Sequence, residues 1–138
     1  MKANGKNYII AALAIALFVS ILFHAPGGSS ARIFGTYVHG DQFLGDALYL
    51  VFEPGGFYAK YRQFEMLDYG AYELLADNIY ALTSFTDNTT RQVLHHRDTI
   101  YMFDQYQQIL AFERIATRPT YINVQPPDFS PWRLDTDY

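Results

Sequence analysis

The chain has 138 residues, a formal net charge of −4, an apolar fraction of 50% and no cysteine. This length fits one domain, and the aromatic fraction of 17% is too high for a chain that is disordered throughout. The absence of cysteine excludes both a disulfide framework and a thiolate metal site.

The N-terminal part has the pattern of a membrane segment. No Asp, Glu, Lys or Arg lies between Lys6 and Arg32, and within residues 8–23 only Ser20 is clearly polar. A helix over residues 7–25 would be roughly 28 Å long, close to the hydrocarbon thickness of about 30 Å. We therefore expect residues 1–25 to form a membrane anchor or a signal segment, with residues 7–25 in contact with the membrane.

The charges around this segment predict its orientation. Lys2 and Lys6 precede it, so the N-terminus is expected in the cytoplasm and the rest of the chain outside, at the cell membrane. Cleavage is the alternative, because small residues at Ser29 and Ala31 follow the apolar run, and the product would then be secreted. The remaining chain is acidic, which disfavours binding to nucleic acid.

A linker at residues 26–31, Pro-Gly-Gly-Ser-Ser-Ala, precedes the outer domain, which we place at residues 32–124. Short apolar runs in this domain alternate with turn residues such as Pro54-Gly55-Gly56 and Asp77-Asn78. The runs fall at residues 33–38, 47–53, 57–64, 69–75, 79–84, 92–96, 99–103 and 108–115.

Eight runs at a spacing of about ten residues, without a helix long enough to cross over, predict an all-β fold. We expect an antiparallel up-and-down meander that forms either a small barrel or a strongly rolled sheet. For residues 64–68, a single helical turn is an alternative to a strand. Residues 120–124 read as a ninth strand or as a lid across one end of the barrel.

Three residues give a likeness to known barrels. Gly35 and Tyr37 stand in the first run, and Arg114 stands in the last. The domain thereby resembles the lipocalin and fatty-acid-binding-protein superfamily, in which a Gly-x-Trp and a late Arg close the base of the barrel, although Tyr37 replaces the Trp. The chain also looks similar to uncharacterised small membrane-anchored β-proteins of Gram-positive bacteria.

Aromatic side chains are the first candidates for ligand binding. Alternating tyrosines suit either a packed core or a cavity for an apolar or sugar-like ligand. The candidate ligand-binding residues are Tyr49, Tyr58, Tyr61, Tyr72, Tyr80 and Tyr101.

Catalytic patterns are weak. His95 and His96 are adjacent, and neighbouring residues of a strand point to opposite faces, so one metal ion cannot easily use both. The sequence has no nucleophile elbow, phosphate-binding loop or zinc-helix motif. We therefore expect no enzyme activity, no metal and no cofactor.

Residues 125–138 form a Pro-rich tail with acidic and aromatic side chains. Phe129, Trp132 and Tyr138 are candidate anchors for docking to a partner, and a self-packed or disordered terminus is the alternative.

The sequence thus predicts a membrane-anchored, extracytoplasmic, non-catalytic binding domain. Its expected partner is a small amphipathic ligand or an envelope protein. The alternative is an accessory or scaffold subunit of a membrane complex that docks through its tail.

Overall fold

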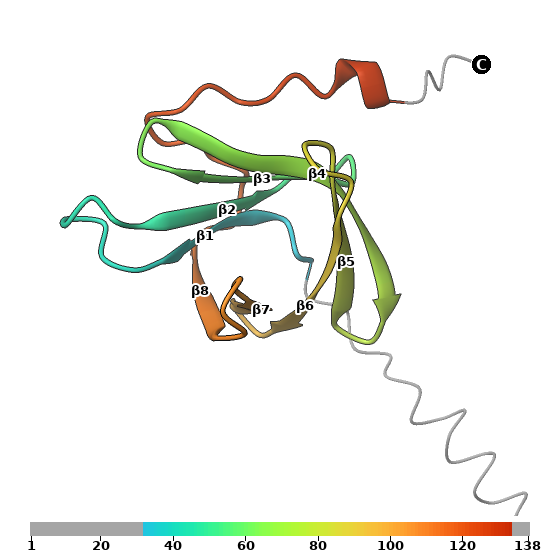
Figure 1. Ribbon diagram of the computed structural model, residues 1–138, viewed down its shortest axis with the longest axis horizontal. Coiled ribbons are helices and arrows are strands. Elements are labelled where there is room, and N and C mark those ends of the chain that lie inside the picture. Colours follow the sequence, from blue (N-terminus) through green and yellow to red (C-terminus); the bar gives the residue numbers. More distant parts are fainter. Residues whose placement is uncertain (1–31, 134–138) are drawn as a thin grey trace, which may run out of the picture. The chain divides into compact units, whose positions relative to one another are not determined.

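The computed structural model describes residues 32–133, and these residues form a closed antiparallel β-barrel (Figure 1). Its strands follow chain order around the barrel. They are β1 (Gly35–His39), β2 (Leu48–Phe52), β3 (Phe57–Arg62), β4 (Glu65–Ala76), β5 (Ile79–Ser84), β6 (Thr90–His96), β7 (Thr99–Phe103) and β8 (Ile109–Ala116). A short 3-10 helix, η1 (Ser130–Trp132), follows.

The structure therefore confirms the all-β meander and decides between the two architectures in favour of the closed barrel. Closure comes from the pairing of β1 with β8, where Tyr37 lies opposite Arg114 and the register shifts between Thr36 and Tyr37. Pairing of the first strand with the last leaves no open sheet edge. The predicted membrane segment at residues 7–25 and the linker at residues 26–31 lie outside the described residues.

β4 is the longest strand and connects the two halves of the barrel. Residues 64–68, for which a helical turn was one prediction, belong mainly to this strand, so that prediction is wrong. Gly70 lies at the centre of β4 and pairs with Tyr58 on one side and Ser84 on the other. A Cβ atom at Gly70 would lie far inside van der Waals contact with the carbonyl oxygen of Thr83, so only glycine allows β4 and β5 to approach this closely.

The barrel has two apolar clusters, one inside and one outside. The inner cluster is the barrel core and includes Tyr37, Leu50, Phe52, Ile100 and Phe112. The outer cluster lies on β1, β2 and β3 and includes Val38, Tyr49, Val51 and Tyr61.

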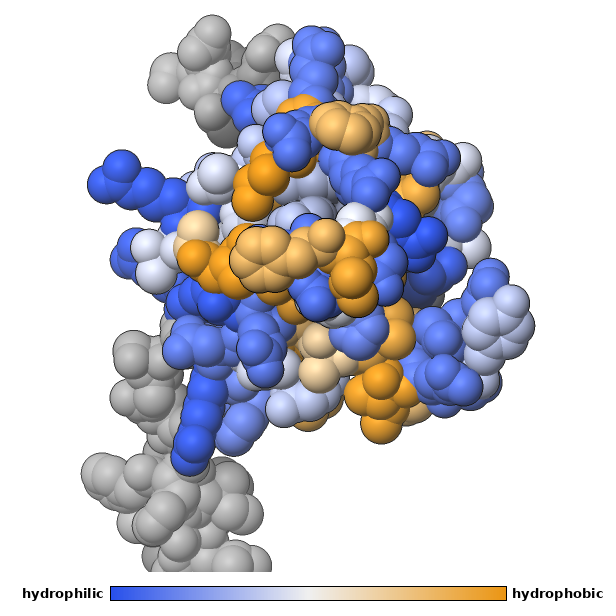
Figure 2. All heavy atoms as spheres, turned by 90° about the vertical axis from the view of Figure 1, so that its left-hand side faces the viewer, coloured by the Kyte–Doolittle hydropathy of each residue, from blue (hydrophilic) through white to orange (hydrophobic). Residues whose placement is uncertain are grey.

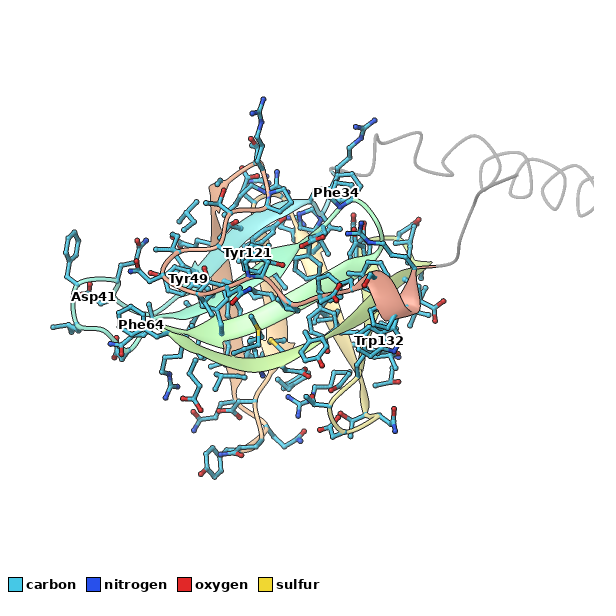
Figure 3. The ribbon with its side chains drawn as sticks, turned by 90° about the horizontal axis from the view of Figure 1, so that it is seen from above. Phe34, Asp41, Tyr49, Phe64, Tyr121 and Trp132 are labelled. Atoms are coloured by element: carbon cyan, nitrogen blue, oxygen red, sulfur yellow. The ribbon has the colours of Figure 1, made fainter. Side chains whose placement is uncertain are left out.

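The chain after β8 covers the outer cluster. Residues 117–133, which we call the strap, run back over the sheet above β3 and β4 (Figure 1). Tyr121, Ile122 and Val124 pack on the outer cluster, and Figure 3 shows Tyr121 close to Tyr49. Residues 120–124 are therefore neither a ninth strand nor a lid across a barrel end: they shield the side of the barrel.

The end of the strap packs on a further set of aromatic rings. Phe129 is 3% exposed and stacks on Phe57 with ring centroids 4.7 Å apart. Trp132 stacks on Phe85 at 4.4 Å. The two rings thus fix the strap to the barrel surface.

Candidate functional site

Two hollows at opposite ends of β8 are candidates for a site. One lies beside Arg114 and Arg118, and the other lies at the first residues of β8, beside Leu110. The two hollows differ in the half-buried cation that lines each of them, which is Arg114 in the first and Lys60 in the second.

The hollow beside Arg114 is closed off by internal bonds. The Arg114 guanidinium donates to the Tyr37 hydroxyl and to the carbonyl oxygen of Arg32, and it pairs with Asp98 at 3.4 Å. The Tyr37 hydroxyl in turn donates to the carbonyl oxygen of Ile33 at 2.8 Å. Since Arg114 is engaged by its own chain, we assign this end to the closure of the barrel; Arg118, which also lines the hollow, is exposed and forms no ion pair within the described residues.

Gly35 belongs to the same closure. Its φ angle is +136°, and a Cβ atom there would collide with the carbonyl oxygen of Ala116 on β8. The three residues named from the sequence, Gly35, Tyr37 and Arg114, therefore all lie where β1 and β8 meet.

The hollow at the other end, which we call the mouth, has a volume of about 470 Å³. Its floor is the top of the barrel core, and its wall comes from β2, β3, β4, β6, β7, β8 and the turn after β7. The lining residues are Leu48, Lys60, Arg62, Leu67, Arg91, Met102, Phe103, Asp104, Gln105, Tyr106, Leu110 and Phe112.

Three cations line this apolar hollow. Lys60 and Arg62 alternate with outward-facing residues of β3, and Arg91 comes from β6 across the barrel. Burial lowers the pKa of Lys60, and the charge of Arg91 lowers it further, while Asp68 and Asp87 oppose the shift. Within residues 32–133 neither of the two ion pairs involves a mouth cation.

The nearby carboxylates are bound to other groups. Asp68 lies opposite Lys60 in the register but accepts hydrogen bonds from the hydroxyls of Tyr58, Ser84 and Thr86 at 2.6–2.8 Å. Asp104 accepts from two backbone N–H groups of its own turn. The mouth therefore combines apolar side chains with three cations that form no ion pair within the described residues, and with the carboxylate of Asp104.

The loops at this end also expose apolar side chains. Phe43 and Leu44 in the loop between β1 and β2 are 99% and 75% exposed, and Phe64 and Tyr106 are similarly open. Figure 2 views the protein from the side of this loop and shows hydrophobic side chains in a band across the face. Figure 3 places Asp41 and Phe64 at this end, far from Trp132.

No family model, no curated protein and no solved structure matches this chain. The function must therefore be argued from the geometry alone.

The six candidate tyrosines do not meet in one place. Tyr58, Tyr72 and Tyr80 belong to the inside of the barrel, where they help to fill the core. Tyr49 and Tyr61 stack on each other at 4.9 Å beneath the strap. These five tyrosines therefore do not line one shared cavity in the described residues, and for Tyr58, Tyr72 and Tyr80 the packed core is the alternative that the structure shows.

The sixth, Tyr101, lies on the outer face of β7 and is half-exposed. Two of the tyrosine hydroxyls inside the barrel bind the protein's own groups: Tyr58 donates to Asp68 at 2.8 Å, and Tyr72 donates to the Glu53 carbonyl oxygen at 2.7 Å. Burial raises the pKa of Tyr72, so this hydroxyl stays protonated and continues to donate.

The tail residues are also engaged within the chain. Trp132 is 42% exposed, whereas Phe129 is buried against Phe57 and is therefore not accessible to a partner. Tyr138 lies outside the described residues. The self-packed alternative is the one found for Phe129 and Trp132.

His95 and His96 point to opposite faces of β6, as predicted: His95 is 1% exposed and His96 is exposed. Burial lowers the pKa of His95, and the charge of Arg114 lowers it further. Among residues 32–133 no three His, Asp or Glu side chains lie close enough to hold a metal ion. No helix within the described part is long and apolar enough to span a bilayer.

The positions of the mouth cations Lys60, Arg62 and Arg91 were not predicted from the sequence. Their signal was present in β3, where Tyr58, Lys60 and Arg62 share one face and Phe57, Ala59 and Tyr61 share the other. Because the inward face carries two cations and the outward face carries Phe57 and Tyr61, alternation alone favours the wrong face as the inner one.

Proposed function

We propose that this protein is a non-catalytic binding protein that takes a small amphipathic anion in the mouth of its barrel. The single observation that carries the proposal is the juxtaposition of Lys60 and Arg91 with an apolar floor, since neither cation forms an ion pair within the described residues. A volume of about 470 Å³ is in the range of pockets for small molecules.

The chemistry of the walls selects the ligand class. Leu48, Leu110 and Phe112 favour an apolar body, and the cations favour a carboxylate or phosphate group through charge-assisted hydrogen bonds. None of the residues that line the mouth is Ser, Thr, Cys or His, and we propose binding without turnover.

The place of action follows from the sequence. We propose that residues 7–25 anchor the protein in the cell membrane with the barrel outside, where it would capture or present such a ligand. The alternative, an accessory subunit that docks through its tail, has less support because Phe129 is buried in the molecule's own packing.

The test is equilibrium dialysis of radiolabelled decanoate against the full-length protein in lipid nanodiscs, with empty nanodiscs as the blank. Lys60→Met and Arg91→Met are each expected to weaken decanoate binding by about tenfold or more, the loss typical of a hydrogen bond to a charged group. Arg97→Met is the matched control, because Arg97 is an exposed arginine in the turn between β6 and β7, away from the mouth.

Decanol, with the same chain and no charge, should bind more weakly and should not respond to Lys60→Met or Arg91→Met. No saturable decanoate binding above the blank would refute the proposal. An equal loss in Arg97→Met would refute the assignment of the site to the mouth.

A further inference from the structure

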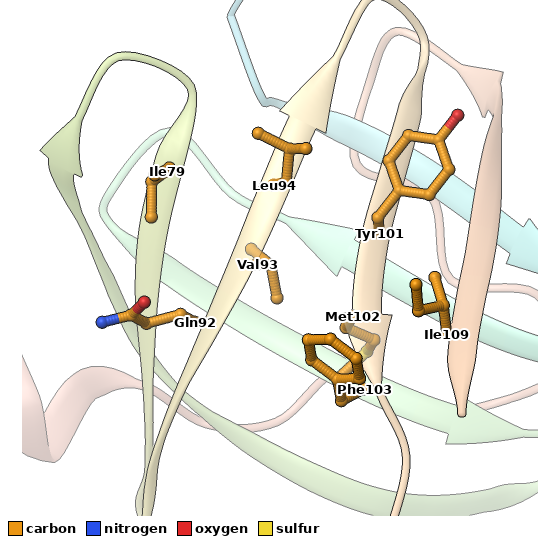
Figure 4. Close-up of a pocket in the computed structure, with 8 residues that line it drawn as sticks. All are labelled: Ile79, Gln92, Val93, Leu94, Tyr101, Met102, Phe103 and Ile109. Carbon is orange, nitrogen blue, oxygen red and sulfur yellow. The ribbon is translucent and has the colours of Figure 1, made fainter. Parts of the chain in front are cut away.

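The outer face of β6, β7 and β8 carries an apolar groove beside the mouth. It has a volume of about 290 Å³ and is lined by Ile79, Gln92, Val93, Leu94, Tyr101, Met102, Phe103 and Ile109 (Figure 4). Leu94, Phe103 and Ile109 are 45%, 55% and 64% exposed, respectively. These side chains come from three adjacent strands and form one continuous apolar surface.

The register explains why the surface is continuous. Leu94 lies opposite Ile79 on one side and opposite Tyr101 on the other, and Phe103 lies opposite Ile109. Directly opposed side chains on one face of a sheet contact each other, so these pairs form a ladder across the strands.

The two outer faces of the barrel are treated differently by the chain. On β1, β2 and β3 the strap covers the apolar cluster with Tyr121, Ile122 and Val124. On β6, β7 and β8 no segment of residues 32–133 covers Leu94, Phe103 and Ile109, as their exposure shows. Water-facing apolar side chains gathered in a groove are typical of a binding surface.

The groove and the mouth meet at the end of β7. Met102 and Phe103 line both hollows. Met102 is buried and points into the barrel, whereas the next residue, Phe103, points out, so the end of β7 is the rim between the two. A molecule held in the mouth reaches the groove by passing over this rim.

We propose that the groove holds the chain of a single-chain amphiphile whose anionic head group is bound in the mouth. The occupant follows from two features: the cations Lys60 and Arg91 fix the charged end, and Met102 and Phe103 connect that end to the apolar groove. This inference rests on the proposed function, since it extends the same ligand from the mouth to the outer face.

The inference predicts a dependence on chain length. A chain that ends inside the mouth does not contact the groove, whereas each further methylene buried in the groove should tighten binding by about fourfold. Truncation of the groove side chains should therefore weaken long alkanoates and leave short ones unchanged.

The experiment compares octanoate, decanoate, dodecanoate and tetradecanoate, each below its critical micelle concentration, in equilibrium dialysis with the full-length protein in nanodiscs. Partition into the lipid is the same for all variants in identical discs and cancels in the comparison. The test variants are Ile109→Thr and Leu94→Thr, both at exposed positions that line the groove and not the mouth, where a folding defect is not expected. Ile115→Thr is the matched control, because Ile115 is an exposed isoleucine at the opposite end of the outer face of β8.

The expected result is that Ile109→Thr and Leu94→Thr weaken tetradecanoate by about tenfold or more and change octanoate by less than twofold, while Ile115→Thr changes neither. If octanoate binds through Lys60 but the gain with chain length is the same in all variants, the groove is not used and this inference is overturned. If no alkanoate binds at all, the proposed function fails and the inference fails with it.

Discussion

The hydroxyl oxygen of Tyr37 offers the most direct test of what stabilises the closure between β1 and β8. Tyr37 is 0% exposed, and its hydroxyl donates to the Ile33 carbonyl oxygen at 2.8 Å and accepts from Arg114 Nε at 3.1 Å. Tyr37→Phe removes this oxygen with almost no change in volume. It leaves the buried Ile33 carbonyl oxygen and two guanidinium N–H groups, on Nε and Nη2 of Arg114, without these partners, and it removes a 3.4 Å contact with His95 Nε2.

The loss in the free energy of unfolding caused by Tyr37→Phe follows from these lost hydrogen bonds. An unsatisfied buried polar group costs about 1–3 kcal/mol, and a hydrogen bond to a charged group contributes about 1.5–3 kcal/mol. Arg114 keeps the carbonyl oxygen of Arg32 at 2.7 Å and Asp98, so part of the second cost is avoided. We expect a loss of about 2–4 kcal/mol, which is a large part of the 5–15 kcal/mol typical of a domain.

The assay is pulse proteolysis in urea on the full-length protein in nanodiscs, which reports the free energy of unfolding. Tyr101→Phe is the control, because Tyr101 is half-exposed and a change below about 0.5 kcal/mol is expected there. In a double-mutant cycle, Tyr37→Phe and Arg114→Met should show a coupling energy of about 1–3 kcal/mol. A loss below 0.5 kcal/mol for Tyr37→Phe, or zero coupling, would refute this account of the closure.

Three further predictions concern the fold. Because the pKa of His95 is lowered in the folded state, the unfolded chain binds more protons than the folded chain below about pH 6.5. The free energy of unfolding should therefore fall on acidification by at most about 1.4 kcal/mol per pH unit. His95→Gln should remove this slope in urea titrations at pH 5–7. Gly70→Ala should destabilise the barrel by several kcal/mol because its Cβ meets Thr83, whereas Gly55→Ala, in ordinary contact only, should change the unfolding midpoint little. Phe129→Ala should cost about 3–5 kcal/mol if the strap unfolds together with the barrel; early proteolysis of the strap at an unchanged midpoint would show instead that it opens separately.

Much of the strand pattern followed from local chemistry. Short apolar runs with a period of two, separated by Asn, Asp and Gly, indicate strands and tight turns in any context. Asn78 and Asn88 have the positive φ angles that such turns require, and both lie at turns predicted from the sequence. Turns this short leave antiparallel neighbours as the only connection, so the order of the strands around the sheet was determined as well.

Only the tertiary structure decided which face of each strand is inside. Along β3 the inward face carries Tyr58 with the two mouth cations, whereas the outward face carries Phe57 and Tyr61, which lie beneath the strap. The strap itself has no period and contains prolines, so its sequence carries no signal of the cluster that it covers.

The candidate site depends on the same decision. Lys60 and Arg91 are far apart in the chain, and they come together only because the pairing of β1 with β8 closes the sheet and turns their faces inward. The sequence by itself determined the strands and their order, and the anchor at residues 7–25 stays a prediction. Closure of the barrel decided where the cations, the tyrosines and the uncovered groove lie, because a side chain's face is fixed by contacts that are distant in sequence.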